Sequence, residues 1–124
     1  MTAVPMQLID NSVWIPAQVN GQPILFILDT GDAVGPVFNA DDAATLALPQ
    51  GDPLQVTGAG GQASGIYATT ATIILGDNDF EYDNEPSAVD PNLEGPSLLG
   101  LPFFTARTSF LGFDFNGSEL VIVP

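Results

Sequence analysis

Short apolar runs alternate with turn-forming residues along the whole chain, which predicts many short strands. Residues 12–19 alternate loosely between apolar and polar positions, as a half-buried strand does. Asn20 and Gly21 then give the signal for a tight hairpin turn, because both tolerate positive φ. Residues 24–28 are five apolar residues in succession, which predicts a strand buried on both faces. The first hairpin therefore delivers Asp29 at the end of a buried strand.

One short helix is predicted after this hairpin. Asn39 is a good N-cap for residues 40–46, and Asp41 and Asp42 fall in the first turn, where the helix dipole favours anions. We therefore interpret these two aspartates as helix-start residues and not as catalysts.

A glycine-rich tip separates two further predicted strands, at residues 54–57 and 66–75. Glycines at a hairpin tip let the backbone approach a ligand closely, so the hairpin is either a plain flexible connection or a lid. A phosphate-binding loop is disfavoured, because no lysine follows the glycines. The tip consists of Gly58, Ala59, Gly60 and Gly61.

Carboxylates alternate with other residues along positions 77–85, and an extended strand would place all of them on one face. A solvated face is favoured over a calcium site, since the run lacks the glycine of an EF-hand loop and a strand spreads its ligands apart. The carboxylates are those of Asp77, Asp79, Glu81, Asp83 and Glu85. Residues 87–96 are predicted to form a loop.

The last third of the chain predicts a buried strand end at residues 98–100 and a short helix opened by Pro102. Residues 110–123 then form two apolar runs joined by an Asn-Gly turn, which predicts a closing hairpin. Residues 1–10 are interpreted as an irregular lead-in.

The length of 124 residues indicates one domain, residues 1–124, with a single core. The chain has no cysteine and no histidine, so disulfides, thiol nucleophiles and imidazole bases are excluded. Catalysis must then come from carboxylates, hydroxyls or the backbone. We expect no cofactor and no metal.

The charge is strongly acidic, with fifteen acidic residues, the single base Arg107 and a formal net charge of −14. Nucleic acids and anionic membranes would be repelled, so neither is an expected partner, and a solubility surface is the simplest explanation. No apolar run reaches the length of a membrane span, and no signal peptide is evident, so membrane insertion is not expected. If a leader has been removed, a periplasmic or secreted location is favoured.

Three motifs follow one another along the sequence: an apolar strand with Asp29-Thr30-Gly31, a glycine-tipped hairpin, and Leu-Leu-Gly with a short helix. In this order and spacing the chain resembles the retropepsin-like aspartic proteases, and most of all their bacterial single-domain members. The resemblance implies an all-β fold, a closed barrel or sandwich with a ψ-loop motif, a flap hairpin and one or two short helices. The second ψ-motif would be Leu98, Leu99 and Gly100.

The resemblance also implies a function. A single Asp-Thr-Gly is half of an active site, so a homodimer would bring Asp29 of two copies together to activate a water that hydrolyses a peptide bond. Thr30 and Gly31 would form the framework of this site. The glycine-tipped hairpin would be the flap that closes over an extended peptide substrate.

Two positions depart from the family pattern. Asp32 follows the motif where the family usually has a small residue, and its charge would raise the pKa of neighbouring carboxylates and favour acidic operation. Leu101 stands where retroviral members carry an arginine that ties the dimer together, and that role is not transferred to Arg107.

Two alternatives remain open at this stage. Asp32 supports a catalytically inactive relative that serves as a peptide-binding or assembly module. An unrelated acidic, calcium-binding β domain, with Asp29 as a structural acid, would discard the resemblance altogether.

Overall fold

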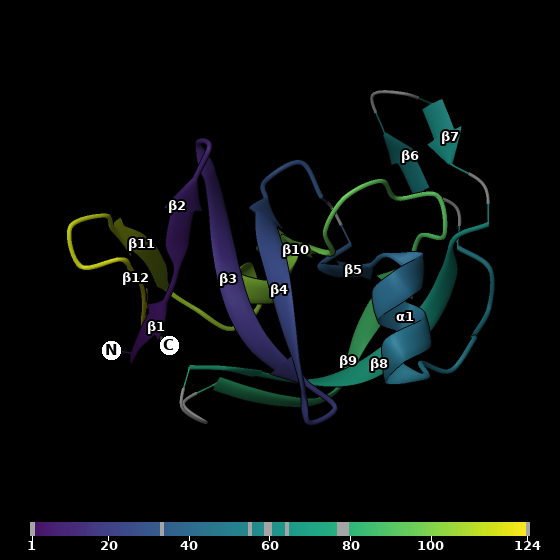
Figure 1. Cartoon of the computed structure of the whole chain (residues 1–124), viewed down its shortest axis with the longest axis horizontal. Helices are drawn as coiled ribbons and strands as arrows, with labels where there is room; N and C mark the ends of the chain where they lie inside the picture. The colour runs from purple at the N-terminus through teal and green to yellow at the C-terminus, as the bar shows by residue number, and fades with distance from the viewer. Residues whose placement is uncertain are drawn as a thin grey trace.

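The computed structural model describes residues 2–32, 34–54, 56–58, 61–63, 65–76 and 80–123, and these form mostly β-strands (Figure 1). Six strands build a barrel that closes because its last strand pairs with its first. In sheet order they are β3 (Ser12–Val19), β4 (Gln22–Asp29), β10 (Leu98–Gly100), β5 (Pro36–Phe38), β9 (Phe80–Val89) and β8 (Tyr67–Leu75). The predicted all-β fold with a closed barrel is confirmed.

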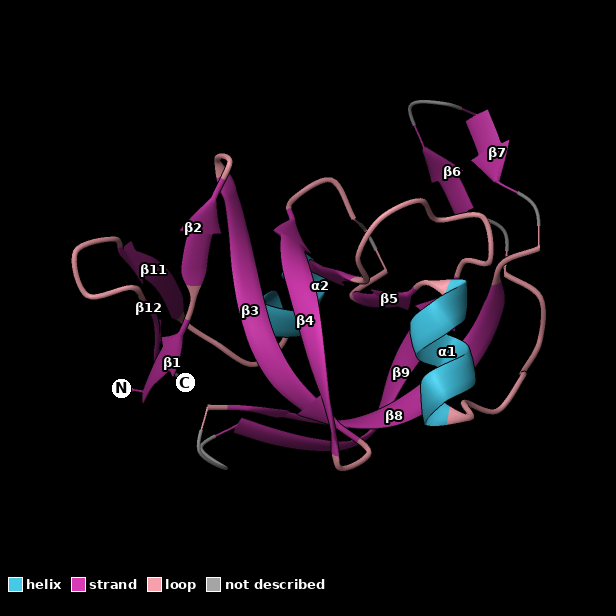
Figure 2. Cartoon of the chain, viewed as in Figure 1, coloured by secondary structure: helices cyan, strands magenta, loops and turns pink. Residues whose placement is uncertain are grey.

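The remaining elements lie around the barrel (Figure 2). β2 (Gln7–Ile9) adds to the barrel sheet next to β3. β1 (Thr2–Pro5), β12 (Glu119–Val123) and β11 (Phe110–Asp114) form a separate sheet, as do β6 (Val56–Gly58) and β7 (Gly61–Ala63). The helices are α1 (Ala40–Leu46) and α2 (Leu101–Thr105). Within the described part of the chain, no helix is long and apolar enough to cross a membrane.

The interpretation of residues 1–10 as an irregular lead-in is wrong. β1 pairs with β12 in antiparallel register, and Figure 1 shows the two chain ends side by side. The buried Val4 lies opposite the buried Leu120. Because the partner strand lies at the other end of the chain, the local pattern of residues 1–10 carries little sign of it.

The first hairpin forms as predicted, with Asn20 at φ +50° and Gly21 at φ +81° in its turn. β4, however, buries only one face. Ile24 and Phe26 point into the barrel, whereas Leu25 on the outer face is 41% exposed. The prediction that residues 24–28 form a strand buried on both faces is therefore wrong, because a strand in a barrel wall has only one face toward the core.

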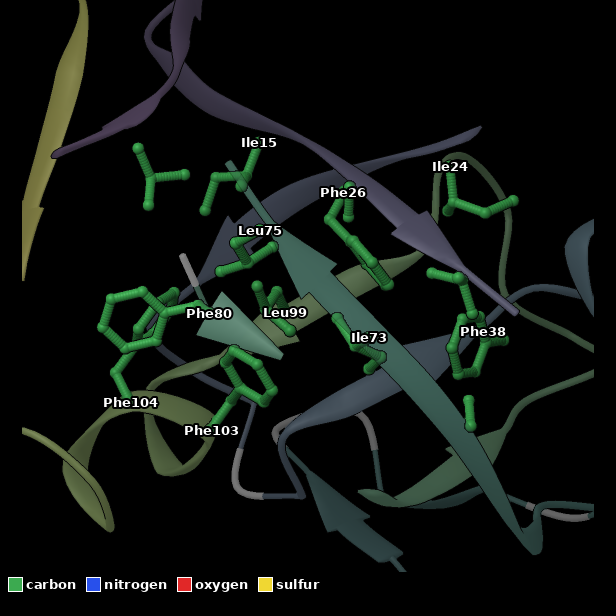
Figure 3. Close-up of a cluster of buried hydrophobic side chains, with 14 of the residues drawn as sticks. Ile15, Ile24, Phe26, Phe38, Ile73, Leu75, Phe80, Leu99, Phe103 and Phe104 are labelled. Carbon is green, nitrogen blue, oxygen red and sulfur yellow. The ribbon is translucent and has the colours of Figure 1, made fainter. Parts of the chain in front are cut away.

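The core fills the barrel and continues onto α2 (Figure 3). Phe26 and Leu99 are fully buried and come from neighbouring strands of the barrel wall. Phe103 and Phe104 of α2 meet edge to face at a centroid distance of 5.1 Å and pack into the same cluster. This packing holds β10 in the wall and places the start of α2 directly after it.

The acidic strand follows its prediction only in part. Glu81 and Asp83 are exposed, as a solvated face requires, but Glu85 is only 7% exposed. The prediction that all five carboxylates share one solvated face is therefore wrong for Glu85, and Asp77 and Asp79 lie outside the described residues. β9 also continues through Val89, so the loop predicted for residues 87–96 begins later.

A β-bulge turns Glu85 inward. β9 has one extra residue relative to β8 just before Glu85, and Asn84 adopts φ +52° there, which reverses the alternation of side chains.

Arg107 donates a hydrogen bond to the Glu85 carboxylate and another, of 2.9 Å, to the Phe103 carbonyl. Its guanidinium also lies 4.3 Å from the centroid of the Tyr82 ring. The only cationic side chain of the sequence thus fastens α2 to the barrel.

Candidate active site

β10 brings the two motifs of the sequence together. It lies between β4, with which it pairs in parallel, and β5, with which it pairs antiparallel. The register sets Leu98 opposite Ile27 and Gly100 opposite Asp29. The end of the Leu-Leu-Gly strand therefore lies beside the end of the strand that carries the aspartate, in the crossed arrangement expected of a ψ-motif.

Asp29 occupies a tight turn at the end of β4. Its Oδ1 accepts a hydrogen bond of 2.9 Å from the Gly31 amide, and its carbonyl accepts one of 3.2 Å from the Asp32 amide. Asp29 is half-buried, whereas Thr30 and Gly31 are exposed. The turn thus presents a positioned carboxylate at the surface, beside two residues that are open to contact with another molecule.

Asp32 follows this turn and contacts both the next loop and β10. Its Oδ1 accepts a hydrogen bond of 2.8 Å from the Val34 amide, whereas its Oδ2 is buried without a hydrogen-bond partner. The carboxyl rests on Gly100: a Cβ added there would lie 2.8 Å from Asp32 Oδ2 and 2.6 Å from the Asp32 carbonyl oxygen. The absence of a side chain at Gly100 makes room for Asp32.

Burial governs the acidity of Asp32. Desolvation raises the pKa of its carboxyl to about 6, the Val34 amide opposes this rise, the charge of Asp29 adds to it, and the Gly35 amide again opposes it. An unpartnered buried oxygen disfavours the charged form, so the acid retains its proton at pH values where an exposed aspartate is ionised.

The loop after Asp32 contributes a contact that the sequence analysis did not single out. The Gly100 amide donates a hydrogen bond of 2.9 Å to the Gly35 carbonyl, and Gly35 adopts φ +104°, which favours glycine. In the sequence, the Gly-Pro pair at residues 35–36 could have indicated a turn here, since such a pair marks a sharp change of chain direction before a strand.

A buried serine anchors the approach to β10. The carbonyl of Ser97 accepts a hydrogen bond of 3.0 Å from the Ile27 amide, which ties it to β4. Its hydroxyl accepts one of 3.0 Å from the Asn39 amide and donates one of 2.6 Å to Asp42 Oδ2. Asn39 caps α1 as predicted, with its Oδ1 accepting from the Asp42 amide at 2.7 Å. Asp42 therefore serves structure, as the sequence indicated, and Asp41 lies beside it in the first turn of α1.

The glycine-tipped hairpin stands out from the barrel and, in the view of Figure 1, reaches the same edge as the end of β4. β6 and β7 pair only with each other, with Gly58 opposite Gly61, and Ala59 and Gly60 lie outside the described residues. At its base the Leu54 amide donates a hydrogen bond of 2.8 Å to the Ile66 carbonyl. Leu54 and Ile66 pack in a small apolar cluster with Val34, Val37, Ala88, Leu93 and Leu98, so the base of the hairpin contacts the ψ-strands.

A sequence family described as aspartyl protease matches residues 15–103, which include the Asp29 turn, the hairpin and the whole of β10. The chain belongs to this aspartyl protease family. No curated protein sequence matches the chain significantly. The assignment thus rests on the family match and on the fold.

Solved structures agree with the family. A retropepsin-like aspartic protease from Rickettsia conorii superposes with a TM-score of 0.65 at 21% identity, over 98% of this chain and 88% of that one. The EIAV protease, solved with the inhibitor HBY-793, superposes with a TM-score of 0.60 at 19% identity, over 81% of this chain and 91% of that one. The chain therefore has a retropepsin-like fold, and the family match and this fold leave the alternative of an unrelated β domain without support.

The structure brings part of the predicted site together. The Asp29 turn and the second ψ-motif form one continuous arrangement, which consists of Asp29, Thr30, Gly31, Asp32, Leu98, Leu99 and Gly100. Gly58 and Gly61 belong to the separate β6–β7 sheet.

Proposed function

We propose that the chain is an aspartic endopeptidase whose active site is completed by a second copy of itself. The observation that carries this proposal is the placement of Asp29: a half-buried carboxylate at the end of β4, in register with Gly100 of β10, with Thr30 and Gly31 exposed beside it. One chain contributes one such aspartate. A twofold axis beside the exposed turn would supply the second one.

The paired Asp29 carboxyls would share one proton, since two carboxylates in contact cannot both ionise comfortably, a behaviour established for aspartic proteases as a class. The ionised Asp29 takes a proton from a water held between the pair. That water bonds to the carbonyl carbon of the peptide, and the other Asp29 gives its proton to the carbonyl oxygen. The first Asp29 then gives the proton it took to the amide nitrogen while the second takes a proton from a hydroxyl of the tetrahedral diol, so the C–N bond breaks to give an amine and an acid, with no covalent enzyme intermediate.

The neighbouring residues would shape this site. Thr30, being exposed, is available to contact its mate across the axis and hold the two turns rigid. At Gly31 a Cβ would come within 3.3 Å of Asp29 Oδ1, so glycine keeps the approach to the carboxylate open. The hairpin tip at Gly58, Ala59, Gly60 and Gly61 would close over the substrate, which binds as an extended strand and pairs through its backbone.

Charge sets the conditions under which this enzyme assembles. Two copies with a net charge of −14 each repel one another at neutral pH and low salt. We expect association and cleavage to appear together, at acidic pH or in high salt, where protonation or screening weakens the repulsion. Sedimentation and peptide-library cleavage at about pH 4 and about pH 8 measure this. Equal activity at both pH values in low salt would contradict it.

Mixing of subunits tests whether the site is shared between two copies. Wild-type chain and Asp29→Asn chain are combined in different proportions at constant total concentration and left to exchange. If both copies supply Asp29, activity follows the square of the wild-type fraction, so an equal mixture keeps about a quarter of the activity. A linear dependence, with about half retained, would show that one chain is sufficient and would overturn the dimeric site.

A further inference from the structure

The carboxyl of Asp32 is partly buried although the carboxylate of Asp29 lies close to it. Its carboxyl packs on the backbone of Gly100, and its Oδ2 is buried with no hydrogen-bond partner. Its main chain at the same time donates to the Asp29 carbonyl. One residue therefore contacts both the turn that carries Asp29 and the end of β10.

We propose that Asp32 is a pH-responsive positioning residue that permits two Asp29 turns to meet when its carboxyl is neutral and drives them apart when it is ionised. This inference rests on the proposed pairing of two Asp29 turns. It assigns to Asp32 a regulatory role at that site and no contact with the substrate.

Two backbone amides, of Val34 and Gly35, partly offset a charge on the Asp32 carboxyl, but desolvation outweighs them. Among the described residues, the carboxyl of Asp29 on β4 is the titratable group whose charge acts on it, and that charge raises its pKa. β10, whose Gly100 contacts the Asp32 carboxyl, contains no ionisable side chain, and neither do its neighbours β5 and α2. Arg107, the only cationic side chain of the sequence, bonds to Glu85 and to the Phe103 carbonyl instead, so within the described part of the chain no cation stabilises the ionised form, and burial makes that form costly.

Ionisation has two consequences at this position. A charged Oδ2 without a partner favours movement of the carboxyl away from Gly100 toward water, which loosens the contact between the turn and β10. In a dimer, two ionised Asp32 residues would also add two negative charges close to the Asp29 pair. Both effects oppose assembly as pH rises through about 6, the pKa of the Asp32 carboxyl.

Salt separates this effect from the general repulsion between acidic surfaces. Exposed charges are largely screened at about 1 M salt, whereas buried charges are screened much less. Sedimentation equilibrium in about 1 M NaCl, at about pH 4.5 and about pH 7.5, therefore leaves ionisation at the paired Asp29 turns as the source of pH dependence, and Asp32→Asn identifies the part that is due to Asp32. We expect the dimer dissociation constant of the wild type to rise at least about tenfold over this range. For Asp32→Asn, which keeps the shape of the neutral acid, we expect a rise at least about threefold smaller than that of the wild type.

The matched control is Asp83→Asn, which removes the same charge from an exposed position on β9 and should behave as the wild type does. Wild-type pH dependence in Asp32→Asn, or an equal loss of it in Asp83→Asn, would overturn the proposal. If Asp32→Asn does not fold, as judged by circular dichroism, Asp32→Ala takes its place. The ¹³C resonance of the wild-type Asp32 carboxyl gives a check without mutation: its titration must coincide with dissociation of the dimer.

These measurements do not depend on catalysis. A pH-dependent dimer that cleaves no peptide would contradict the proposed function and leave the role of Asp32 intact. A chain that is monomeric at every pH would overturn the role of Asp32. Where cleavage is measurable, the alkaline limb of the pH profile of kcat/KM should move up by about one pH unit in Asp32→Asn.

Discussion

Replacement of Asp29 by asparagine is expected to lower kcat/KM for peptide hydrolysis by a factor on the order of 10⁴. In a homodimer the substitution removes both members of the proposed pair at once, so neither a base for the water nor an acid for the carbonyl oxygen remains. The fold should persist, because the side-chain oxygen of the introduced asparagine can still accept the hydrogen bond that Asp29 Oδ1 receives from the Gly31 amide. Progress curves with a peptide library, at the pH of maximal wild-type activity, measure the loss.

Asp83→Asn is again the matched control, since it removes one exposed carboxylate far from the motif in sequence and should leave kcat/KM within about twofold. Retention of more than about a tenth of the wild-type activity in Asp29→Asn would exclude Asp29 as a catalytic residue. Absence of cleavage in the wild type over the whole pH range would favour the inactive peptide-binding or assembly module.

Substitution of Gly100 by alanine is expected to lower the free energy of unfolding by about 1–3 kcal/mol, as overpacking of a close contact does. A Cβ at this position would lie 2.6 Å from the carbonyl oxygen of Asp32 and 2.8 Å from its Cγ. The main-chain oxygen cannot rotate away, so the turn and β10 must separate. Urea denaturation, followed by circular dichroism, measures the change. Because Gly100 lies opposite Asp29, we also expect a loss of cleavage activity in the folded variant.

Gly112→Ala provides the comparison. Gly112 lies in β11, and the atoms nearest to a Cβ there belong to the ring of Phe110, a side chain that is 56% exposed and free to turn aside. We expect this variant to change stability by less than about 0.5 kcal/mol. Equal stability of the two alanine variants would show that the close contact between Gly100 and Asp32 does not hold the site together.

The double variant Asp32→Ala/Gly100→Ala shows how much of the loss of stability in Gly100→Ala comes from the Asp32 side chain and how much from the Asp32 main chain. Removal of the Asp32 carboxyl relieves the contacts with Cγ and Oδ2 but not the contact with the carbonyl oxygen. The two substitutions should therefore couple, with part of the destabilisation retained.

Much of the local structure was predictable because its causes act within a few residues. The turn at Asn20 and Gly21, the Asn39 cap of α1, the short helix after Gly100 and the closing hairpin all form where the sequence placed them. Positive φ, capping and the fixed φ of proline are properties of single residues and their immediate neighbours.

The failures of prediction have a common origin in contacts between distant parts of the chain. β1 was missed because its partner is β12. Glu85 was assigned to a solvated face because a bulge that interrupts strict alternation is visible only against the partner strand. The burial of β4 was overestimated because an apolar run does not reveal which of its faces a barrel covers.

The sequence by itself determined the all-β class, the first and the closing hairpins, and the presence of Asp29-Thr30-Gly31 at the end of an apolar strand. Only the tertiary structure decided that Gly100 lies opposite Asp29 and that Asp32, a departure from the family pattern, is packed on Gly100 with a buried, unpartnered oxygen. The physical reason is that register and burial depend on side chains brought together from opposite ends of the sequence, whereas turns and strands depend on neighbours.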